Sequence, residues 1–261
     1  MAEAQYHVSL NRLAHVFTDG REPLTALQDI SLGVPRGQFL SIIGPTGSGK
    51  STLLRIAGGL MQPTQGLAQI DGEAPAKAQR RREIGFVFQD PALLPWRNVV
   101  ANVRLPLEID GVRRRPLPDP EQLIDLVGLA GFRDYYPHQL SGGMQQRVAI
   151  ARALAFDPSL LLMDEPFGAL DEITRSDMRY ELLRLWSRVE SAGRKTVLFV
   201  THSIAEALVL SDRVVVLSSR PGRVLADLDV ELDRPRTQDI ERSPAFLDYS
   251  DYLRGLLREA A

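Results

Sequence analysis

The segment GPTGSGKS, Gly44–Ser51, combines the glycines, lysine and serine that a phosphate-binding loop requires. Glycines let the backbone curl so that successive N–H groups point at phosphate oxygens. We expect Lys50 to reach the β- and γ-phosphates of a nucleotide and the Ser51 hydroxyl to ligate Mg²⁺. The positive end of the helix that follows adds to the attraction. The predicted nucleotide-binding residues of this segment are Gly44, Pro45, Thr46, Gly47, Ser48, Gly49, Lys50, Ser51 and Thr52.

A second candidate segment, LLLMDEP at Leu160–Pro166, is an apolar run that ends in two adjacent carboxylates. The apolar strand delivers Asp164 to the metal side of the phosphate loop, where it can hold Mg²⁺ directly or through water. Glu165 lies past the end of the strand and can orient and deprotonate an attacking water. The alternative is an ordinary helix cap after a buried strand, but the phosphate loop upstream favours hydrolysis.

Two further strand-like runs end in polar residues. Gln89 follows IGFVF, where its amide can face the metal and the γ-phosphate, and His202 follows VLFVT. Each residue alone is better explained as a polar residue at a strand end. Together with Asp164 they are typical of ligand sites at the carboxyl ends of parallel strands.

The segment LSGGMQQR, Leu140–Arg147, supplies a second loop suited to an anion. Ser141, Gly142 and Gly143 precede a helical pattern, so their N–H groups and the helix dipole form an anion site. This segment is poorly placed to reach the nucleotide of its own chain. We expect two chains to associate head to tail, so that each LSGG closes on the other chain's γ-phosphate. The alternative is a purely structural helix cap.

Strands alternate with helices along most of the chain, which predicts an α/β fold with a mostly parallel sheet. The strand-like runs are Ala26–Val34, Phe39–Ile43, Gly66–Ile70, Ile84–Phe88, Leu160–Met163, Thr196–Val200 and Arg213–Leu217. The predicted helices are Ser51–Gly59, about Gly142–Ala155, Glu172–Val189, Ile204–Leu210 and Ala245–Arg258.

The stretch from about Asp90 to Pro137 departs from this alternation. It is rich in proline, lacks a clear strand and has helical patterning at Val99–Leu107 and Glu121–Val127, which predicts an inserted helical subdomain. We expect one domain over 1–261, with a nucleotide-binding core at 1–89 and about 158–261 and the helical subdomain at about 90–157. The basic run Arg113–Arg115 is interpreted as a solvated loop.

Composition narrows the possible functions. The 261 residues carry a net charge of −2, which gives no electrostatic case for binding nucleic acid. There are no cysteines, and the four histidines show no metal-ligand spacing. No signal peptide and no apolar run long enough to cross a bilayer is visible. We therefore expect a soluble, cytoplasmic protein that takes any membrane span from a partner.

The ordered set of motifs resembles that of the ATP-binding cassette (ABC) ATPases, from Leu10 to about Arg223. GPTGSGKS resembles the Walker A motif, Gln89 the Q-loop glutamine and LSGGMQQR the signature. LLLMDEP resembles Walker B, Ala169–Asp171 the D-loop and His202 the switch histidine. The resemblance implies a P-loop NTPase core with a mostly parallel sheet, an antiparallel β region near the N-terminus and the inserted helical subdomain.

The resemblance also assigns roles. ATP and Mg²⁺ are the implied cofactors, and Ser51, Gln89 and Asp164 the metal-binding residues. Glu165 becomes the catalytic carboxylate, supported by Lys50, Gln89 and His202, and His202 contacts the γ-phosphate. Asp171 communicates across the ATP-sandwich dimer, and Phe17 in HVFTDG is the best match to the aromatic residue that stacks on adenine.

Four further segments resemble those of importer ATPases for nitrate, sulfonate, taurine and thiamine-precursor solutes. The segments that carry this likeness are DPALLPWRN, FGALDEIT, THSIAEA and SDRVVVLSSRPGR. The likeness implies a location at the cytoplasmic face of the inner membrane, integral-membrane permease subunits as partners and, indirectly, a solute-binding protein. Two alternatives remain open: a cassette that exports lipids or lipoproteins, and a soluble cassette protein of DNA repair or translation.

The loop Pro91–Arg97 directly follows Gln89 and contains Leu93, Leu94 and Trp96. An exposed apolar patch with an aromatic residue and an arginine is typical of a protein interface. We expect the loop to present these side chains to a permease. The alternative is that they pack into the helical subdomain's own core.

Overall fold

The computed structural model describes residues 6–18, 22–109, 117–168, 170–188 and 195–260. The basic run Arg113–Arg115, the first D-loop residue Ala169 and the expected last helical residue Val189 lie outside these ranges.

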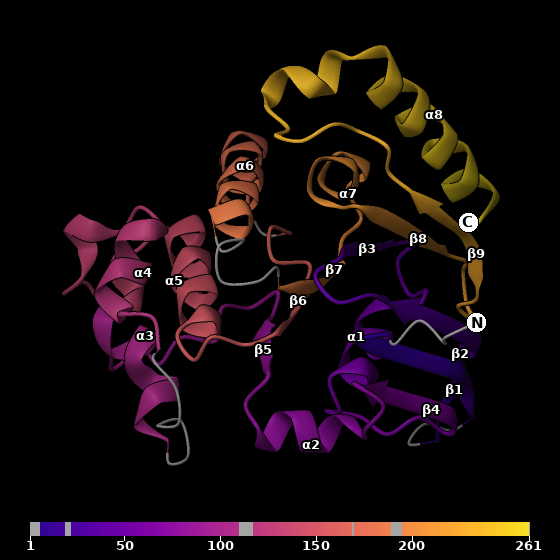
Figure 1. Cartoon of the computed structure of the whole chain (residues 1–261), viewed down its shortest axis with the longest axis horizontal. Helices are drawn as coiled ribbons and strands as arrows, with labels where there is room; N and C mark the ends of the chain where they lie inside the picture. The colour runs from indigo at the N-terminus through magenta and orange to yellow at the C-terminus, as the bar shows by residue number, and fades with distance from the viewer. Residues whose placement is uncertain (1–5, 19–21, 110–116, 169, 189–194, 261) are drawn as a thin grey trace.

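A mostly parallel sheet forms the centre of the molecule (Figure 1). In the described ranges it has six strands in the order β5-β6-β7-β3-β8-β9, of which β9 alone is antiparallel to its neighbour. Such a sheet is covered on both faces, so its strands are continuously apolar, as the sequence indicated. The strands are β3 (Phe39–Ile43), β5 (Ile84–Val87), β6 (Leu160–Asp164), β7 (Thr196–Val200), β8 (Arg213–Leu217) and β9 (Val224–Asp229).

A smaller antiparallel sheet lies beside the first, which confirms the expected β region near the N-terminus. Its strand order is β2-β1-β4, and its strands are β1 (Val8–Phe17), β2 (Leu24–Val34) and β4 (Gln65–Ile70). The sequence pattern did not predict strand β1 or the edge strand β9. In β9 half-buried and exposed positions alternate and two residues are aspartates, so the strand lacks the continuous apolar run of its neighbours.

The helices fall into groups around the sheets (Figure 1). Helix α1 follows the glycine-rich loop, α3–α5 gather to one side of the strands, and α6–α8 lie over one face of the main sheet. Within the described residues the α-helices are α1 (Lys50–Ala57), α2 (Pro75–Arg80), α3 (Val99–Glu108), α4 (Pro120–Leu126), α5 (Gly142–Leu154), α6 (Glu172–Arg188), α7 (Ile204–Leu210) and α8 (Pro244–Glu259). Helix α2 escaped prediction because six residues are too few to establish a helical period.

The hydrophobic core is divided by the main sheet into two layers. Along β3, Phe39 and Ile43 belong to the layer under α5–α8, while Leu40 and Ile42 belong to the layer that contains α1 and the antiparallel sheet. This alternation follows from the two-residue period of a strand. The loop that leaves β3 is therefore held by packing on both faces of its strand.

Helices α3, α4 and α5 pack on one another and form the predicted helical insertion. Side-chain caps begin each helix: Asn98 accepts from the Ala101 N–H, Asp119 from the Glu121 N–H and Ser141 from the Met144 N–H. The division into core and subdomain at residues 90 and 157 stays a prediction. Across the described residues, no helix combines the length and apolar character needed to span a bilayer.

His7 joins the two sheets at the base of the core. Its ring is fully buried and hydrogen bonds through Nδ1 to the hydroxyl of Thr196 at the start of β7. Burial lowers the pKa of His7 to about 4, with a further lowering from Arg36 and an opposing effect of Asp71. The folded protein therefore keeps this imidazole neutral at pH values where the unfolded chain protonates it.

This depressed pKa predicts an acid sensitivity of folding. Between about pH 6.5 and about pH 4 the unfolded chain binds a proton that the folded chain excludes, so His7 costs up to about 1.4 kcal/mol of stability per pH unit as the pH falls. The free energy of unfolding should be measured with urea across this range for the wild type and for His7→Asn. The wild type's advantage over the variant should shrink on acidification; a constant difference would contradict the assignment.

Candidate active site

The phosphate loop is shaped by glycines at positions where other residues are strained. Gly47 and Gly49 have φ values of 81° and 88°, in the left-handed region that glycine adopts without cost. At Gly49 a Cβ atom would also lie 2.7 Å from the Leu27 side chain, so β2 packs directly against the loop. Within the described part of the chain the buried Ser48 Oγ has no hydrogen-bond partner.

Lys50 is the buried cation of the loop. Its Nζ donates to the carbonyl oxygens of Gly44 and Pro45, each at 2.9 Å, which places the ammonium group inside the curve of the loop. Burial lowers the pKa of Lys50, and the carboxylates of Glu165 and Asp164 oppose that effect. A bound polyphosphate would add the negative charge that stabilises the ammonium form here.

Asp164 and Ser51 meet at the same edge of the sheet. The Ser51 hydroxyl donates to Asp164 Oδ1 at 2.7 Å, joining the end of β6 to the start of α1. Burial raises the pKa of Asp164, and the hydrogen bond from Ser51 partly offsets it. A hydroxyl and a carboxylate oxygen are ligands that suit Mg²⁺, so this pair fits the predicted cation.

Glu165 takes an unusual backbone conformation directly after β6. Its φ of 44° lies in the left-handed region, where a residue with a side chain is strained. Two backbone hydrogen bonds hold it: Glu165 N–H donates to Val200 O, and Gly168 N–H donates to Glu165 O, both at 3.0 Å. In this conformation its Oε2 lies 3.4 Å from Nδ1 of His202. The two predicted catalytic side chains are therefore adjacent.

A pocket of about 620 Å³ contains most of the predicted site. Residues from the phosphate loop, the ends of β5, β6 and β7, and β1 contribute to its lining. The predicted residues that line it are Phe17, Thr46, Gly47, Gly49, Lys50, Ser51, Thr52, Gln89, Glu165 and His202. Three lining residues were not predicted: Leu24, Ala26 and Arg220.

The aromatic candidate Phe17 lines this pocket together with Leu24 and Ala26. Its ring packs edge-on against His15, with centroids 4.6 Å apart. These residues form an apolar part of the pocket lining beside the charged loop, which suits a flat base attached to a polyphosphate. Leu24 and Ala26 had no signal of their own in the sequence, because apolar residues at the start of a strand are common.

The signature segment lies elsewhere. Ser141 caps α5 through a 3.3 Å bond from the Met144 N–H, and neither it nor Gly142 nor Gly143 is among the residues that line the pocket. Ser141 and Gly142 are exposed, and a Cβ atom on Gly142 would meet nothing within 4 Å, whereas Gly143 is buried and a Cβ atom there would lie 2.9 Å from the Thr174 side chain. Helix α5 nevertheless contacts the loop after β5, because the Gln146 side chain donates to Phe88 O at 3.2 Å.

Hydrogen bonds and one ion pair connect the D-loop with the loop that carries His202. Asp171, exposed, accepts the Thr174 N–H and caps α6. Arg175 donates to Leu170 O at 2.7 Å and lies 3.9 Å from the buried Glu206 carboxylate. Burial raises the pKa of Glu206, whose carboxylate accepts the hydroxyl of Thr201, the residue before His202. Sequence patterns could not reveal this network, because Arg175 and Glu206 are ordinary polar residues of helices.

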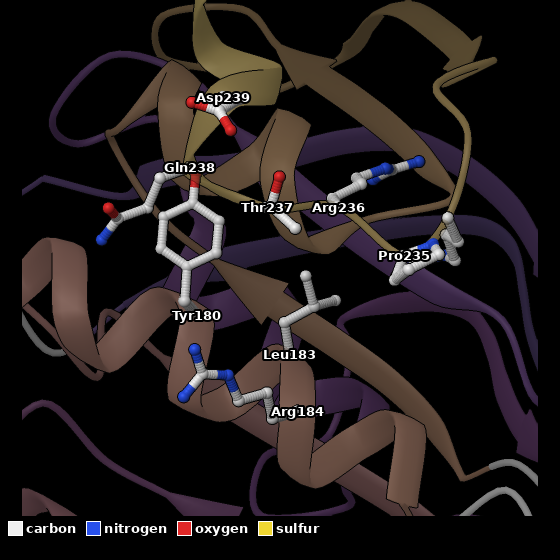
Figure 2. A pocket seen from close by; sticks show the side chains of 9 residues that line it. Tyr180, Leu183, Arg184, Pro235, Arg236, Thr237, Gln238 and Asp239 are labelled. Atoms are coloured by element: carbon white, nitrogen blue, oxygen red, sulfur yellow. The ribbon is translucent and has the colours of Figure 1, made fainter.

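A different pocket, of about 550 Å³, lies between α6 and the segment 234–239. Figure 2 shows Tyr180, Leu183 and Arg184 of α6 facing this segment. Arg236 of this segment stabilises the fold, because its guanidinium donates to backbone carbonyls that include Leu208 O and Ser211 O. None of the predicted site residues lies there, so the chemistry belongs to the pocket at the phosphate loop.

The fold and the converging side chains define a phosphate-loop nucleotide hydrolase. The family model described as "ABC transporter" matches residues 27–168, and the chain belongs to this family of ATP-binding ATPases. The chain is 42% identical to the nitrate import ATP-binding protein NrtD of Synechocystis, over 97% of this chain and 95% of the relative. It is 44% identical to the taurine import ATP-binding protein TauB of Rhizobium johnstonii, over 89% and 88%.

A solved structure has the same fold. The ATP-binding cassette MJ0796, described as a dimer in a post-hydrolysis state bound to ADP and phosphate, superposes with a TM-score of 0.73. The sequence identity is 36%, and the match covers 87% of this chain and all of that one. The fold class and the family expected from the sequence are thereby confirmed.

The buried ammonium of Lys50 leads to the prediction for this site. Lys50→Ala should weaken ATP binding about tenfold or more, because it removes a charge-assisted contact, and should abolish hydrolysis. The control is Lys77→Ala, which removes an exposed lysine of α2. Binding of a fluorescent ATP analogue and phosphate release measure the two effects. Wild-type activity in Lys50→Ala would refute the assignment of the loop.

Proposed function

We propose that this chain is the ATP-hydrolysing subunit of an importer that takes up a small solute through a separate permease. The observation that carries the proposal is the meeting of Lys50, Glu165 and His202 in one pocket at the carboxyl edge of the sheet. Membership of the ABC transporter family and the names of the relatives support import as the use of that ATPase.

The hydrolytic step uses the adjacent pair at the end of β6 and β7. Glu165 accepts a proton from water as the water oxygen attacks the γ-phosphorus, and the bond to the bridging oxygen breaks to release ADP and phosphate. His202, 3.4 Å from the Glu165 carboxylate, is placed to contact the γ-phosphate. Ser51, Asp164 and Gln89 would hold Mg²⁺, which would neutralise charge on the phosphates.

The second half of each site comes from another copy of the chain. Ser141, Gly142 and Gly143 do not line their own nucleotide pocket, and Ser141 and Gly142 are exposed. In the proposed head-to-tail dimer, these N–H groups bind the γ-phosphate held by the partner, and Asp171 lies at the contact between copies. ATP binding closes this dimer, and hydrolysis opens it. The dimeric description of the related cassette supports this arrangement.

The loop 91–97 is the proposed contact with the permease. Trp96 is 71% exposed, whereas Leu93 and Leu94 are half-buried and Leu93 packs against the core. The expectation that all three are exposed was therefore wrong for the two leucines. Buried Asn102 bonds to Leu94 N–H and to Arg97 O, so the loop presents Trp96 from a rigid base.

Helix α5 is bonded to the same loop. Arg152 donates to Ala92 O at 2.8 Å and to Pro91 O at 2.6 Å, two and one residues beyond Asp90. A movement of the loop would therefore reach both Gln89 and the helix that begins at the signature. This connection is the proposed route from permease to nucleotide.

The proposed solute is a small organic or inorganic anion of the nitrate, sulfonate or taurine kind, or a thiamine-precursor-like molecule. The support is the identity to nitrate and taurine import proteins. The chain would act at the cytoplasmic face of the cell membrane, with a solute-binding protein delivering the solute to the permease. Nucleic acid has no part in this function.

The role of Glu165 predicts a trapped dimer. Glu165→Gln should lower the hydrolysis rate about 10²–10⁴-fold, because the general base is lost, while ATP still binds. With Mg-ATP the variant should elute as a dimer in size-exclusion chromatography, either alone or, if association is weak, within the assembled transporter. Asp251→Asn on exposed α8 is the matched control. A variant that stays monomeric in both settings would rule out the closed dimer.

The exposure of Trp96 predicts a defect in coupling alone. Trp96→Ala should leave the isolated subunit folded and hydrolysing ATP at its basal rate, because the side chain is mostly in solvent. In the reconstituted transporter it should weaken attachment to the permease or abolish stimulation by loaded binding protein. Tyr252→Ala, an exposed aromatic residue of α8, is the control. Normal assembly and stimulation, or unfolding of the isolated subunit, would contradict the proposed contact.

A further inference from the structure

The loop after β8 reaches the nucleotide pocket through Arg220, which is among the residues that line it. It comprises residues 218–223, with the sequence SSRPGR. Its two ends are bonded to each other, since Ser218 N–H donates to Arg223 O and Arg223 N–H donates to Ser218 Oγ, both at 2.9 Å. The loop is therefore a closed turn whose tip carries Arg220.

Gly222 fixes this turn against the phosphate loop and β2. Its N–H donates to Ala26 O at 2.9 Å, and its carbonyl accepts the Gln28 N–H at 3.0 Å. A Cβ atom at Gly222 would lie 2.1 Å from Ser48 O, a distance that no side chain could tolerate. The turn is thus in close contact with the backbone of the phosphate loop, and this contact fixes its position relative to that loop.

The Arg220 side chain extends over the loop. Its Nη2 lies 3.1 Å from the position that a Cβ atom on Gly47 would occupy, and Arg220 lines the same pocket as Lys50. Within the described residues Arg220 is exposed and forms no ion pair, whereas other arginines, such as Arg97 and Arg213, are paired with carboxylates. An arginine without a carboxylate, held against a phosphate loop, points to an anionic ligand.

We propose that Arg220 is a second nucleotide-binding cation, which donates hydrogen bonds to a phosphate oxygen of the nucleotide held over Gly47. This inference rests on the proposed location of ATP in the pocket. Lys50 binds the phosphates from inside the loop, and Arg220 binds them from its outer rim. The turn is hydrogen-bonded to β2, which also supplies Leu24 and Ala26 to the pocket. The residues proposed to bind the phosphates and those proposed to contact the base are therefore held by connected segments.

The test measures binding of fluorescent ADP to the isolated chain, because ADP needs no second copy to bind. Arg220→Ala should weaken ADP binding about tenfold, the size of a charge-assisted hydrogen bond at a partly exposed site. The affinity of Arg220→Ala for ADP should also depend less on salt concentration than that of the wild type, since one phosphate contact is lost. Arg220→Lys should recover part of the affinity, because it restores the charge without the planar fork.

The matched control is Arg223→Ala in the same turn, whose guanidinium bonds to Gln28 Oε1 at 2.7 Å and does not line the pocket. It should bind ADP as the wild type does. Circular dichroism and thermal unfolding exclude misfolding of either variant. Equal losses in both variants would mean that the turn acts only as a structural support, and this would overturn the proposal.

Two other results would also overturn it. Unchanged ADP affinity in Arg220→Ala would show that the guanidinium does not touch phosphate. Normal ADP binding together with loss of the ATP-bound dimer in the Glu165→Gln background would show that it contacts the second copy instead. If the nucleotide does not bind at the proposed site, Lys50→Ala would bind ADP normally as well. This result distinguishes failure of the proposed ATP site from failure of the Arg220 proposal.

Discussion

The site depends on the register of parallel strands. Asp164 at the end of β6 pairs with Val200 at the end of β7, and the Glu165 N–H bonds to the carbonyl of that same valine. Because β3 runs parallel beside β7, the phosphate loop leaves the sheet at the same edge. Hydrogen bonds between backbones thus fix the spacing between Glu165, His202 and the phosphate loop. The strained φ of Glu165 persists because the bond to Val200 holds its N–H and the turn to Gly168 holds its carbonyl.

Two connections extend this arrangement beyond the pocket. The Gln146 side chain bonds α5 to the loop after β5, and Arg175 with Glu206 bonds the D-loop to the segment that carries His202. The buried Glu206 carboxylate is expensive to desolvate, so its position is set by the groups that bond to it. Specific hydrogen bonds therefore connect the helical subdomain and the D-loop to the edge of the sheet that carries Glu165 and His202, in addition to the packing of α5 in the core.

The family, the main sheet and most residues of the pocket were predictable from the sequence, because the pattern for each lies within a short segment. A phosphate loop and a polar residue after an apolar run are visible within a few positions. Leu24, Ala26 and Arg175 escaped notice because their roles arise only when distant segments fold together. Arg220 could have been found, since it follows β8 at the same edge as Gln89 and His202, and the rule applied to those strands also covers this one. Trp96 was predicted correctly as exposed, while Leu93 is drawn inward by the helices around it.

The open helix start at Ser141 has a consequence for mixed populations of chains. A copy whose signature faces away from its own nucleotide can complete a site only on its partner, and each proposed dimer contains two such shared sites. A chain with a damaged phosphate loop and an intact signature would still associate with normal copies and occupy one half of the assembly. Such a chain would act as a dominant inhibitor in cells that also carry the normal gene, and its effect would rise with its dose.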